Sequence, residues 1–207
     1  MLHPTSPRRL TAALTVLIVA AAASAHLGSS SPRPQDAAQA VRTNEDARLM
    51  QAFSRSVDAY VALRDQIEAA LPPRGPNPDV EQAHAHRMEL ARRLRVKRGR
   101  AHEGDLFTRE IRALFRRLIA RSLTADDVAR LRRELRGEEA PHFEARVNGG
   151  YLGTEGLTSV PSGLLINLPD LPPDLEYRFV GEDVVLRDIR AGLIVDFVHD
   201  ALPKRGR

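Results

Sequence analysis

The segment from Leu175 to Val198 reads LEYRFVGEDVVLRDIRAGLIVDFV and decides the fold class. It contains three runs of branched and aromatic residues, 175–180, 184–189 and 193–198, separated by short spacers that each contain a glycine. Extended runs this close together pair as antiparallel hairpins, because a tight turn reverses the chain between them. The spacing therefore predicts a three-stranded antiparallel sheet near the C-terminus.

Upstream of this segment, apolar residues recur every three or four positions, which is the period of a helix that buries one face. The pattern predicts helices over 44–71 and after each of three capping residues, Asp79, Thr108 and Thr124. A small sheet is not stable alone in water and must lay one face on such helices. We therefore predict an α+β fold of about four amphipathic helices followed by the three-stranded sheet.

Local signals mark the ends of two of these helices. Thr43 or Asn44 can cap the first one, because their side chains accept hydrogen bonds from free backbone N–H groups. Thr124 and Asp127 have the spacing of a capping box, in which each side chain binds the backbone of the other residue. Gly137 is suited to end the last helix, since glycine tolerates the backbone conformation found there.

The helices and the sheet are expected to share one core. The predicted single domain has a helical part and a loop-and-sheet part, over 41–137 and 138–203 of a domain that spans 41–207. Tyr177 and Phe179 alternate onto the same face of their strand. We expect both rings to be buried against the helical stripe that contains Phe115.

Residues 1–25 have the three parts of a secretory signal peptide. Arg8 and Arg9 form a positive start, residues 10–23 carry no charge, and residues 23–25 have the small-x-small pattern of a cleavage site. The apolar run is shorter than the roughly 20 residues that a transmembrane helix needs. We therefore expect cleavage after this segment and a periplasmic or secreted protein. The alternative is an uncleaved signal that anchors the protein in the inner membrane.

The composition of the chain argues against several classes of protein and of functional site. Residues 26–40 are rich in glycine, serine and proline, so we expect a flexible linker with little apolar surface to bury. The chain has no cysteine, which excludes disulfides, thiol catalysis and cysteine-bound zinc. The formal net charge of +4 falls to +2 without Arg8 and Arg9, and so small a charge gives no reason to expect nucleic-acid binding.

Several short stretches occur together: 104–108 (GDLFT), 115–118 (FRRL), 164–165 (LL), 168–169 (LP), 175–179 (LEYRF), 183–186 (DVVL) with Asp188, 193–197 (LIVDF) and 201–203 (ALP). The combination resembles a family of uncharacterised exported proteins from soil-type bacteria, over most of the chain that follows the signal. This resemblance implies export and a single domain. It implies no activity, and it supplies no catalytic residue.

Two Glu-x-x-His pairs raise the question of a metal site: Glu81 with His84, and Glu139 with His142. On a helix this spacing places a carboxylate and an imidazole one turn apart, and two such pairs with two further glutamates form a di-metal site in a helix bundle. The second pair contains Pro141, which disfavours a helix there. We therefore expect solvated histidines, no metal site and no cofactor.

A dense basic run between residues 92 and 100 contains six cations: Arg92, Arg93, Arg95, Lys97, Arg98 and Arg100. Clustered cations attract anionic surfaces, so these residues are candidates for contact with an anionic envelope surface or an acidic partner. The other interpretation is a solvated helix end, at which cations suit the negative pole of the helix dipole. This second interpretation is the more typical of such a run.

Asp188 and Asp196 interrupt strands that are otherwise apolar. Two neighbouring carboxylates can act as an acid and a base. We favour the other interpretation, in which each pairs with an arginine such as Arg178 or Arg187 on the partly exposed side of the sheet. Ser162 lacks the strand-turn-helix motif of a nucleophilic serine and is expected to begin a short helix.

None of these patterns favours catalysis over a structural explanation. The sequence therefore predicts an exported, non-enzymatic envelope or interaction protein, whose partner is an envelope protein or an anionic envelope surface. The alternative is an exported hydrolase or metalloprotein with a site that the sequence does not reveal. No membrane span is expected once the signal has been removed.

Overall fold

The computed structural model describes residues 34–73, 79–135, 144–151 and 160–204. The elements in these ranges are α1 (Pro34–Ala69), α2 (Val80–Lys97), α3 (Arg109–Ser122), α4 (Ala125–Leu135), α5 (Ser162–Leu165), β1 (Leu175–Val180), β2 (Asp183–Asp188) and β3 (Leu193–Val198). The strands form one antiparallel sheet in the order β1-β2-β3. The predicted α+β fold, with helices first and a small sheet last, is therefore confirmed.

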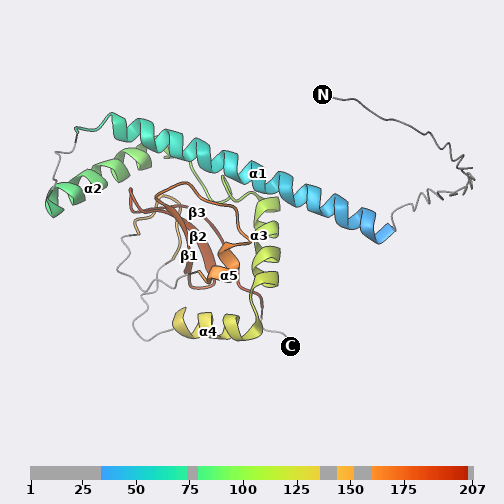
Figure 1. Cartoon of the computed structure of the whole chain (residues 1–207). Coiled ribbons are helices and arrows are strands. Elements are labelled where there is room, and N and C mark those ends of the chain that lie inside the picture. Colours follow the sequence, from blue (N-terminus) through green and yellow to red (C-terminus); the bar gives the residue numbers. More distant parts are fainter. Residues whose placement is uncertain (1–33, 74–78, 136–143, 152–159, 205–207) are drawn as a thin grey trace, which may run out of the picture.

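The long helix α1 spans one side of the molecule (Figure 1). α2 runs back beneath the C-terminal end of α1, and α3 stands beside the sheet and also contacts α1. α4 lies at the end of the sheet opposite to α1, while the N-terminal part of α1 extends past α3. The helices thus surround one side and both ends of the small sheet, as its size requires.

Three helices begin at the expected capping residues. Asp79 Oδ1 accepts a hydrogen bond of 2.7 Å from the backbone N–H three residues further on. Thr108 Oγ1 does the same for α3, at 3.4 Å. At α4, Asp127 N–H donates to Thr124 Oγ1 and Thr124 N–H donates to Asp127 Oδ2, both at 3.1 Å. The predicted capping box is therefore confirmed, and it satisfies donors that a helix end leaves free.

The first helix differs from the prediction at its start. It begins at Pro34, within the 26–40 segment expected to be a linker and before the expected cap at Asn44. Proline suits the first turn of a helix, where its missing N–H costs no hydrogen bond. Thr43 does not cap the helix, because its hydroxyl donates to the Gln39 carbonyl one turn earlier, at 3.0 Å. The rest of the expected linker, the predicted signal peptide and Gly137 lie outside the described residues.

The sheet contains one irregularity that matters for the polar contacts described below. Leu186 lies opposite Asp196, but Arg187 lies opposite Ile194, so Val195 is an extra residue in β3. Such a β-bulge leaves its residue without a partner in the ladder and changes the direction of the side chains around it. The predicted bounds of β1 and β3 are confirmed, whereas β2 begins and ends one residue earlier than expected.

Both faces of the sheet are covered. The main core joins apolar residues of α1 to α4 with residues of all three strands. Phe179 is fully buried in it, and the Tyr177 ring lies 5.8 Å from the Phe115 ring, as expected. A second, smaller core on the other face consists of Ala145, Tyr151, Val185, Ile194 and Phe197. Within the described ranges, the sheet therefore has no broad exposed face.

Candidate functional site

Asp188 is buried and joins the β2–β3 turn to α1. Its Oδ2 accepts a hydrogen bond of 2.7 Å from the Tyr60 hydroxyl, and its Oδ1 accepts one of 2.8 Å from Ala191 N–H. The Arg64 guanidinium lies 3.6 Å from Oδ2. Burial, followed by the negative charge of Asp188, raises the pKa of Tyr60 well above its ordinary value. The phenol therefore keeps its proton and remains a hydrogen-bond donor.

Asp196 is also buried, and it holds the segment before α3 against β3. Its two oxygens accept hydrogen bonds from four backbone N–H groups, those of Gly104 (3.1 Å), Leu106 (2.8 Å), Phe107 (2.8 Å) and Phe197 (2.8 Å). A buried carboxylate is stable only with partners of this kind. Asp196 thus fixes the loop that leads into α3.

The expected partners of the two aspartates were wrong. Arg178 and Arg187 both bind Glu176, at 2.6 and 2.7 Å. The physical reason is that both faces of the sheet are covered, so the aspartates lie inside the protein and not on a partly exposed face. Each of their four carboxylate oxygens accepts a hydrogen bond from the fold. This arrangement explains the two residues as structural groups rather than as an acid and a base.

The inner part of the basic run binds the backbone of the sheet region. Arg98 donates to Asn148 Oδ1 at 2.7 Å and to the Val195 carbonyl at 3.0 Å. Val195 is the bulged residue, so Arg98 supplies the donor that the ladder does not. The Arg98 guanidinium also lies 5.0 Å from the centre of the Tyr60 ring, and Arg95 donates to the Asn148 carbonyl at 3.0 Å. Both arginines belong to the fold.

These contacts connect into one set of polar side chains, of which all but the half-buried Asn148 are buried. We call it the interior network, and its members are Tyr60, Arg64, Arg98, Asn148 and Asp188. The network joins α1, the end of α2, the segment 144–151 before α5 and the turn between β2 and β3. It links segments far apart in the sequence, and Tyr60 and Asp188 are separated by 128 positions.

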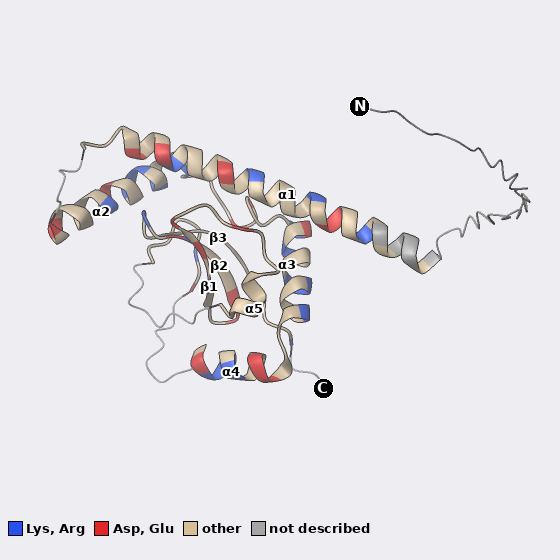
Figure 2. Ribbon diagram, in the orientation of Figure 1, with Lys and Arg blue, Asp and Glu red and all other residues tan. Residues whose placement is uncertain are grey.

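The outer part of the same run faces solvent. Arg92 and Arg93 each place Nε 2.7 Å from a Glu89 oxygen, and these hydrogen bonds lower the pKa of Glu89 to about 2. Lys97 and Arg100 are exposed, and no hydrogen bond or ion pair joins either side chain to another described residue. Lys and Arg gather at the end of α2 near α1, whereas its other end carries an acid (Figure 2). The cations suit the helix dipole, as the sequence suggested.

A groove runs between α1 and α2 beside these cations. It has a volume of about 370 Å³ and is lined by Gln66, Ile67, Ala70, Arg92, Arg93, Val96 and Lys97. Val96 is 72% exposed although it is apolar. We call the α2 side of this groove the outer basic face, and it consists of Arg92, Arg93, Val96 and Lys97. In this face, the exposed Arg92 and Lys97 lie beside an exposed aliphatic side chain. Arg93 is half-buried and donates to the Ala70 carbonyl at 3.2 Å, so it also joins α2 to the residue that follows α1.

The Glu-x-x-His hypothesis finds no support in the described residues. Glu81 and His84 are exposed on the first turns of α2, and Glu139 and His142 lie outside the described residues. Within the part of the chain that the structure describes, no three His, Asp or Glu side chains come close enough to hold a metal ion. Ser162 begins the short helix α5, as expected.

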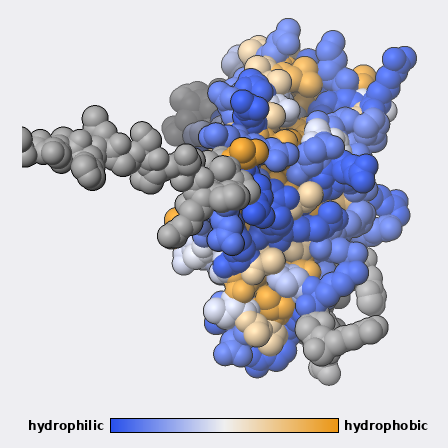
Figure 3. Space-filling view, turned by 90° about the vertical axis from the view of Figure 1, so that its right-hand side faces the viewer, coloured by the Kyte–Doolittle hydropathy of each residue, from blue (hydrophilic) through white to orange (hydrophobic). Residues whose placement is uncertain are grey.

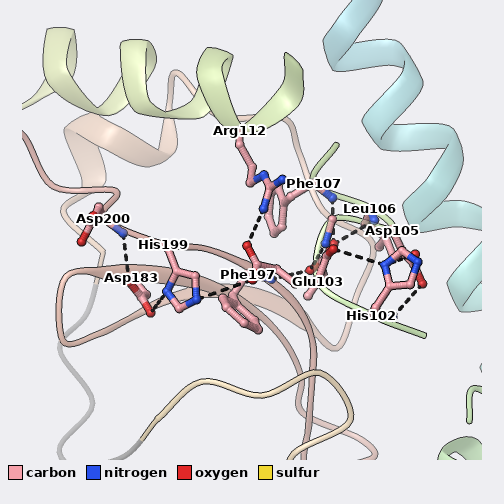
Figure 4. A network of polar contacts seen from close by, with 12 residues as sticks. His102, Glu103, Asp105, Leu106, Phe107, Arg112, Asp183, Phe197, His199 and Asp200 are labelled. Atoms are coloured by element: carbon pink, nitrogen blue, oxygen red, sulfur yellow. Dashed lines mark hydrogen bonds and ion pairs between the residues drawn. The ribbon is translucent and has the colours of Figure 1, made fainter. Parts of the chain in front are cut away.

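A histidine cluster that the sequence analysis missed lies at the end of the sheet (Figure 4). His199 Nδ1 is 2.8 Å from Asp183 Oδ2, and its Nε2 is 3.6 Å from Glu103 Oε2. Arg112 of α3 contacts the same glutamate. Burial raises the pKa of Asp183, although the backbone N–H of Asp200 and His199 oppose this effect. The hairpin register indicates this contact, because Val184 lies opposite Val198 and the next residues outward are Asp183 and His199.

The chemistry of this cluster is that of an ion-pair network. A histidine oriented by a carboxylate through Nδ1 can act as a general base when Nε2 faces a reacting group. In this protein Nε2 faces Glu103, which is itself held by Arg112. The cluster therefore ties the loop before α3 to the ends of β2 and β3 (Figure 4).

A larger groove of about 770 Å³ lies between α3, α4 and the C-terminal residues of the described chain. Leu123, Val128 and Pro203 are among its apolar lining residues. On the side of the molecule that α3 occupies, hydrophobic residues form an interrupted band between hydrophilic ones (Figure 3). The groove borders, along the chain, the segments 136–143 and 205–207, which lie outside the described residues, so we assign no ligand to it.

No protein-family model, curated protein or solved structure matches this chain. The resemblance of the C-terminal segment to a family of exported proteins therefore remains a prediction. None of the described helices is long and apolar enough to span a bilayer.

Proposed function

We propose that this protein is exported from a bacterial cell and acts in the envelope as a non-enzymatic binding protein. The observation that carries the proposal is the division of polar groups between the interior network and the outer basic face. The buried carboxylates that suggested acid–base chemistry are bound by the fold. Beside the α1–α2 groove, Val96 is 72% exposed, and the exposed Lys97 makes no hydrogen bond or ion pair with another described residue. Arg92 and Arg93 pair with Glu89, and Arg93 also donates to the Ala70 carbonyl at 3.2 Å.

Site-specific cross-linking in intact cells tests the binding function. A photo-cross-linking amino acid is placed at Arg92 or at Lys97 in the full chain. A control position is Arg130 on α4, which is likewise exposed and paired with a carboxylate on its own helix. We expect covalent adducts from positions 92 and 97, but not from position 130. Equal adducts from all three positions, or none, would contradict the proposal.

Export is supported by the sequence of residues 1–25 and is tested separately. N-terminal sequencing of the protein from the periplasm or the medium should begin at His26, because Ala23 and Ala25 occupy the positions that signal peptidase reads. Protein that keeps Met1 and stays with the inner membrane would instead indicate an uncleaved anchor. Protein that keeps Met1 in the cytoplasm would contradict export.

The alternative function, an exported hydrolase or metalloprotein, draws support from one observation, the oriented and half-exposed His199. Metal analysis of the purified full chain distinguishes the two. We expect less than one equivalent of bound metal, and no change in stability when a chelator is added. One tightly bound zinc or iron per chain would favour the alternative.

A further inference from the structure

We infer that the outer basic face and the adjoining α1–α2 groove dock on an anionic phospholipid surface. This inference rests on the proposed binding function and names the partner. It comes from two features that occur together at this place: solvent-accessible cations in excess over the one acid that pairs with them, and aliphatic side chains exposed among them. An anionic bilayer surface offers a matching partner for each feature.

The charged residues that line the groove are all positive. Arg92, Arg93 and Lys97 line it, and no carboxylate of the described residues does so. Glu89 lies next to it and pairs with both arginines, so the local sum of three cations and one acid remains positive. Cations at the surface of an anionic bilayer each add to its attraction, since the lipid headgroups carry negative charge.

The aliphatic side chains indicate lipid rather than another polyanion. Met88 and Val96 lie four residues to either side of Arg92, so the three side chains are neighbours along the helix. Met88 is 45% exposed and Val96 is 72% exposed. Ile67 of α1 lines the same groove. At the boundary between headgroups and acyl chains such side chains leave water, whereas a nucleic acid or polyphosphate surface would not bury them.

The experiment is co-sedimentation of the exported protein with vesicles. Vesicles of phosphatidylcholine alone are compared with vesicles that also contain phosphatidylglycerol. The test variant is R92Q/R93Q/K97Q, and the matched control is R121Q/R130Q/R133Q, which removes three exposed cations of α3 and α4. A second variant, Val96→Ser, removes the exposed apolar side chain and keeps every charge.

We expect binding only to vesicles that contain the anionic lipid. Binding should fall when the salt concentration rises from about 0.1 M to about 1 M, because screening shortens from about 10 Å to about 3 Å. The groove variant should bind about 100-fold more weakly, since each surface cation contributes about 1 kcal/mol. The control variant should lose much less affinity for the vesicles than the groove variant loses. Val96→Ser should lower the affinity a few-fold.

Other outcomes overturn the inference. Equal binding to neutral vesicles, or unchanged binding by the groove variant, would exclude this face as the lipid-binding surface. Binding to heparin without binding to anionic vesicles, together with no effect of Val96→Ser, would indicate a polyanion instead. If vesicles fail but cross-linking from positions 92 and 97 yields a protein adduct, the lipid partner is wrong and the proposed binding function stands.

Discussion

Two regions of this molecule use the same kinds of residue for opposite purposes. The interior network contains Arg98, which is buried and donates to a loop and to the bulge of β3. The outer basic face contains Lys97, the residue immediately before it, which is exposed. Lys97 is the last residue of α2 and Arg98 is its C-cap, and successive side chains at a helix end point about 100° apart. A charged run is therefore not one functional unit, and each of its members has to be judged by its burial.

The largest expected effect is a loss of stability when the core shared by the helices and the sheet is disrupted. Phe179 is fully buried, so Phe179→Ala should lower the free energy of unfolding by about 3–5 kcal/mol. The measurement is urea denaturation followed by far-ultraviolet circular dichroism, which reports mainly the helices. Val96→Ser is the control from the outer basic face, and it should change stability by less than about 0.5 kcal/mol.

An unchanged helical transition in Phe179→Ala would contradict a single domain. It would mean that the sheet and the helices unfold separately. The interior network would then be a contact between two units, and its comparison with the outer basic face would lose its basis.

A second large effect is expected at the buried carboxylate on β3. Asp196→Ala should cost about 3 kcal/mol or more, because several buried N–H groups lose their acceptor and each unpaired group costs about 1–3 kcal/mol. Asp58→Ala, an exposed aspartate on α1, is the matched control. Equal stability of the two variants would show that Asp196 is not structural, and it would reopen the acid–base interpretation.

How much of this could be predicted from the sequence depends on the range of each signal. The capping residues Asp79 and Thr124 bind backbone groups only three residues further along the chain, so the starts of these helices could be predicted from the local sequence. Ala191 and Phe197 are local partners of Asp188 and Asp196. Their other partners come from segments roughly 90 to 130 positions away, and no local pattern indicates them. The expected pairing with sheet arginines failed for this reason.

Two other features do have a signal in the sequence. Arg98 lies four residues after Leu94, so it continues the buried stripe of α2, and periodicity alone places it on the inner side. His199 follows from the hairpin register, as Val184 lies opposite Val198 and the next pair outward is Asp183 with His199. The groove between α1 and α2 has no such signal, because it depends on how the two helices meet.

A smaller effect on stability is expected from a substitution of Asp183, whose side chain is partly exposed. Burial raises the pKa of this carboxyl in the folded protein, so its ionised form is disfavoured relative to the unfolded chain. The resulting cost is absent below the unfolded pKa of about 3.9 and develops as the pH rises through the folded pKa. Asp183→Asn should therefore gain stability relative to the unchanged protein as the pH rises above about 3.9.

The measurement for this prediction is the difference in free energy of unfolding between the two proteins across that pH range. Solvent screening keeps the change small, since the side chain is not fully buried. A difference that moves in the opposite direction would mean that the ionised carboxylate and His199 stabilise the fold together. Asp183 would then belong with the interior network.

The most direct test of the division between the two regions compares Arg98→Gln with Lys97→Gln. The two residues are adjacent, and each substitution removes one positive charge. We expect Arg98→Gln to lower the free energy of unfolding by about 3 kcal/mol, because two hydrogen bonds from a charged donor are lost inside the protein. Lys97→Gln should change it by less than about 0.5 kcal/mol. Equal effects of the two substitutions in urea denaturation would contradict the division of the basic run into a structural inner part and a solvent-facing outer part.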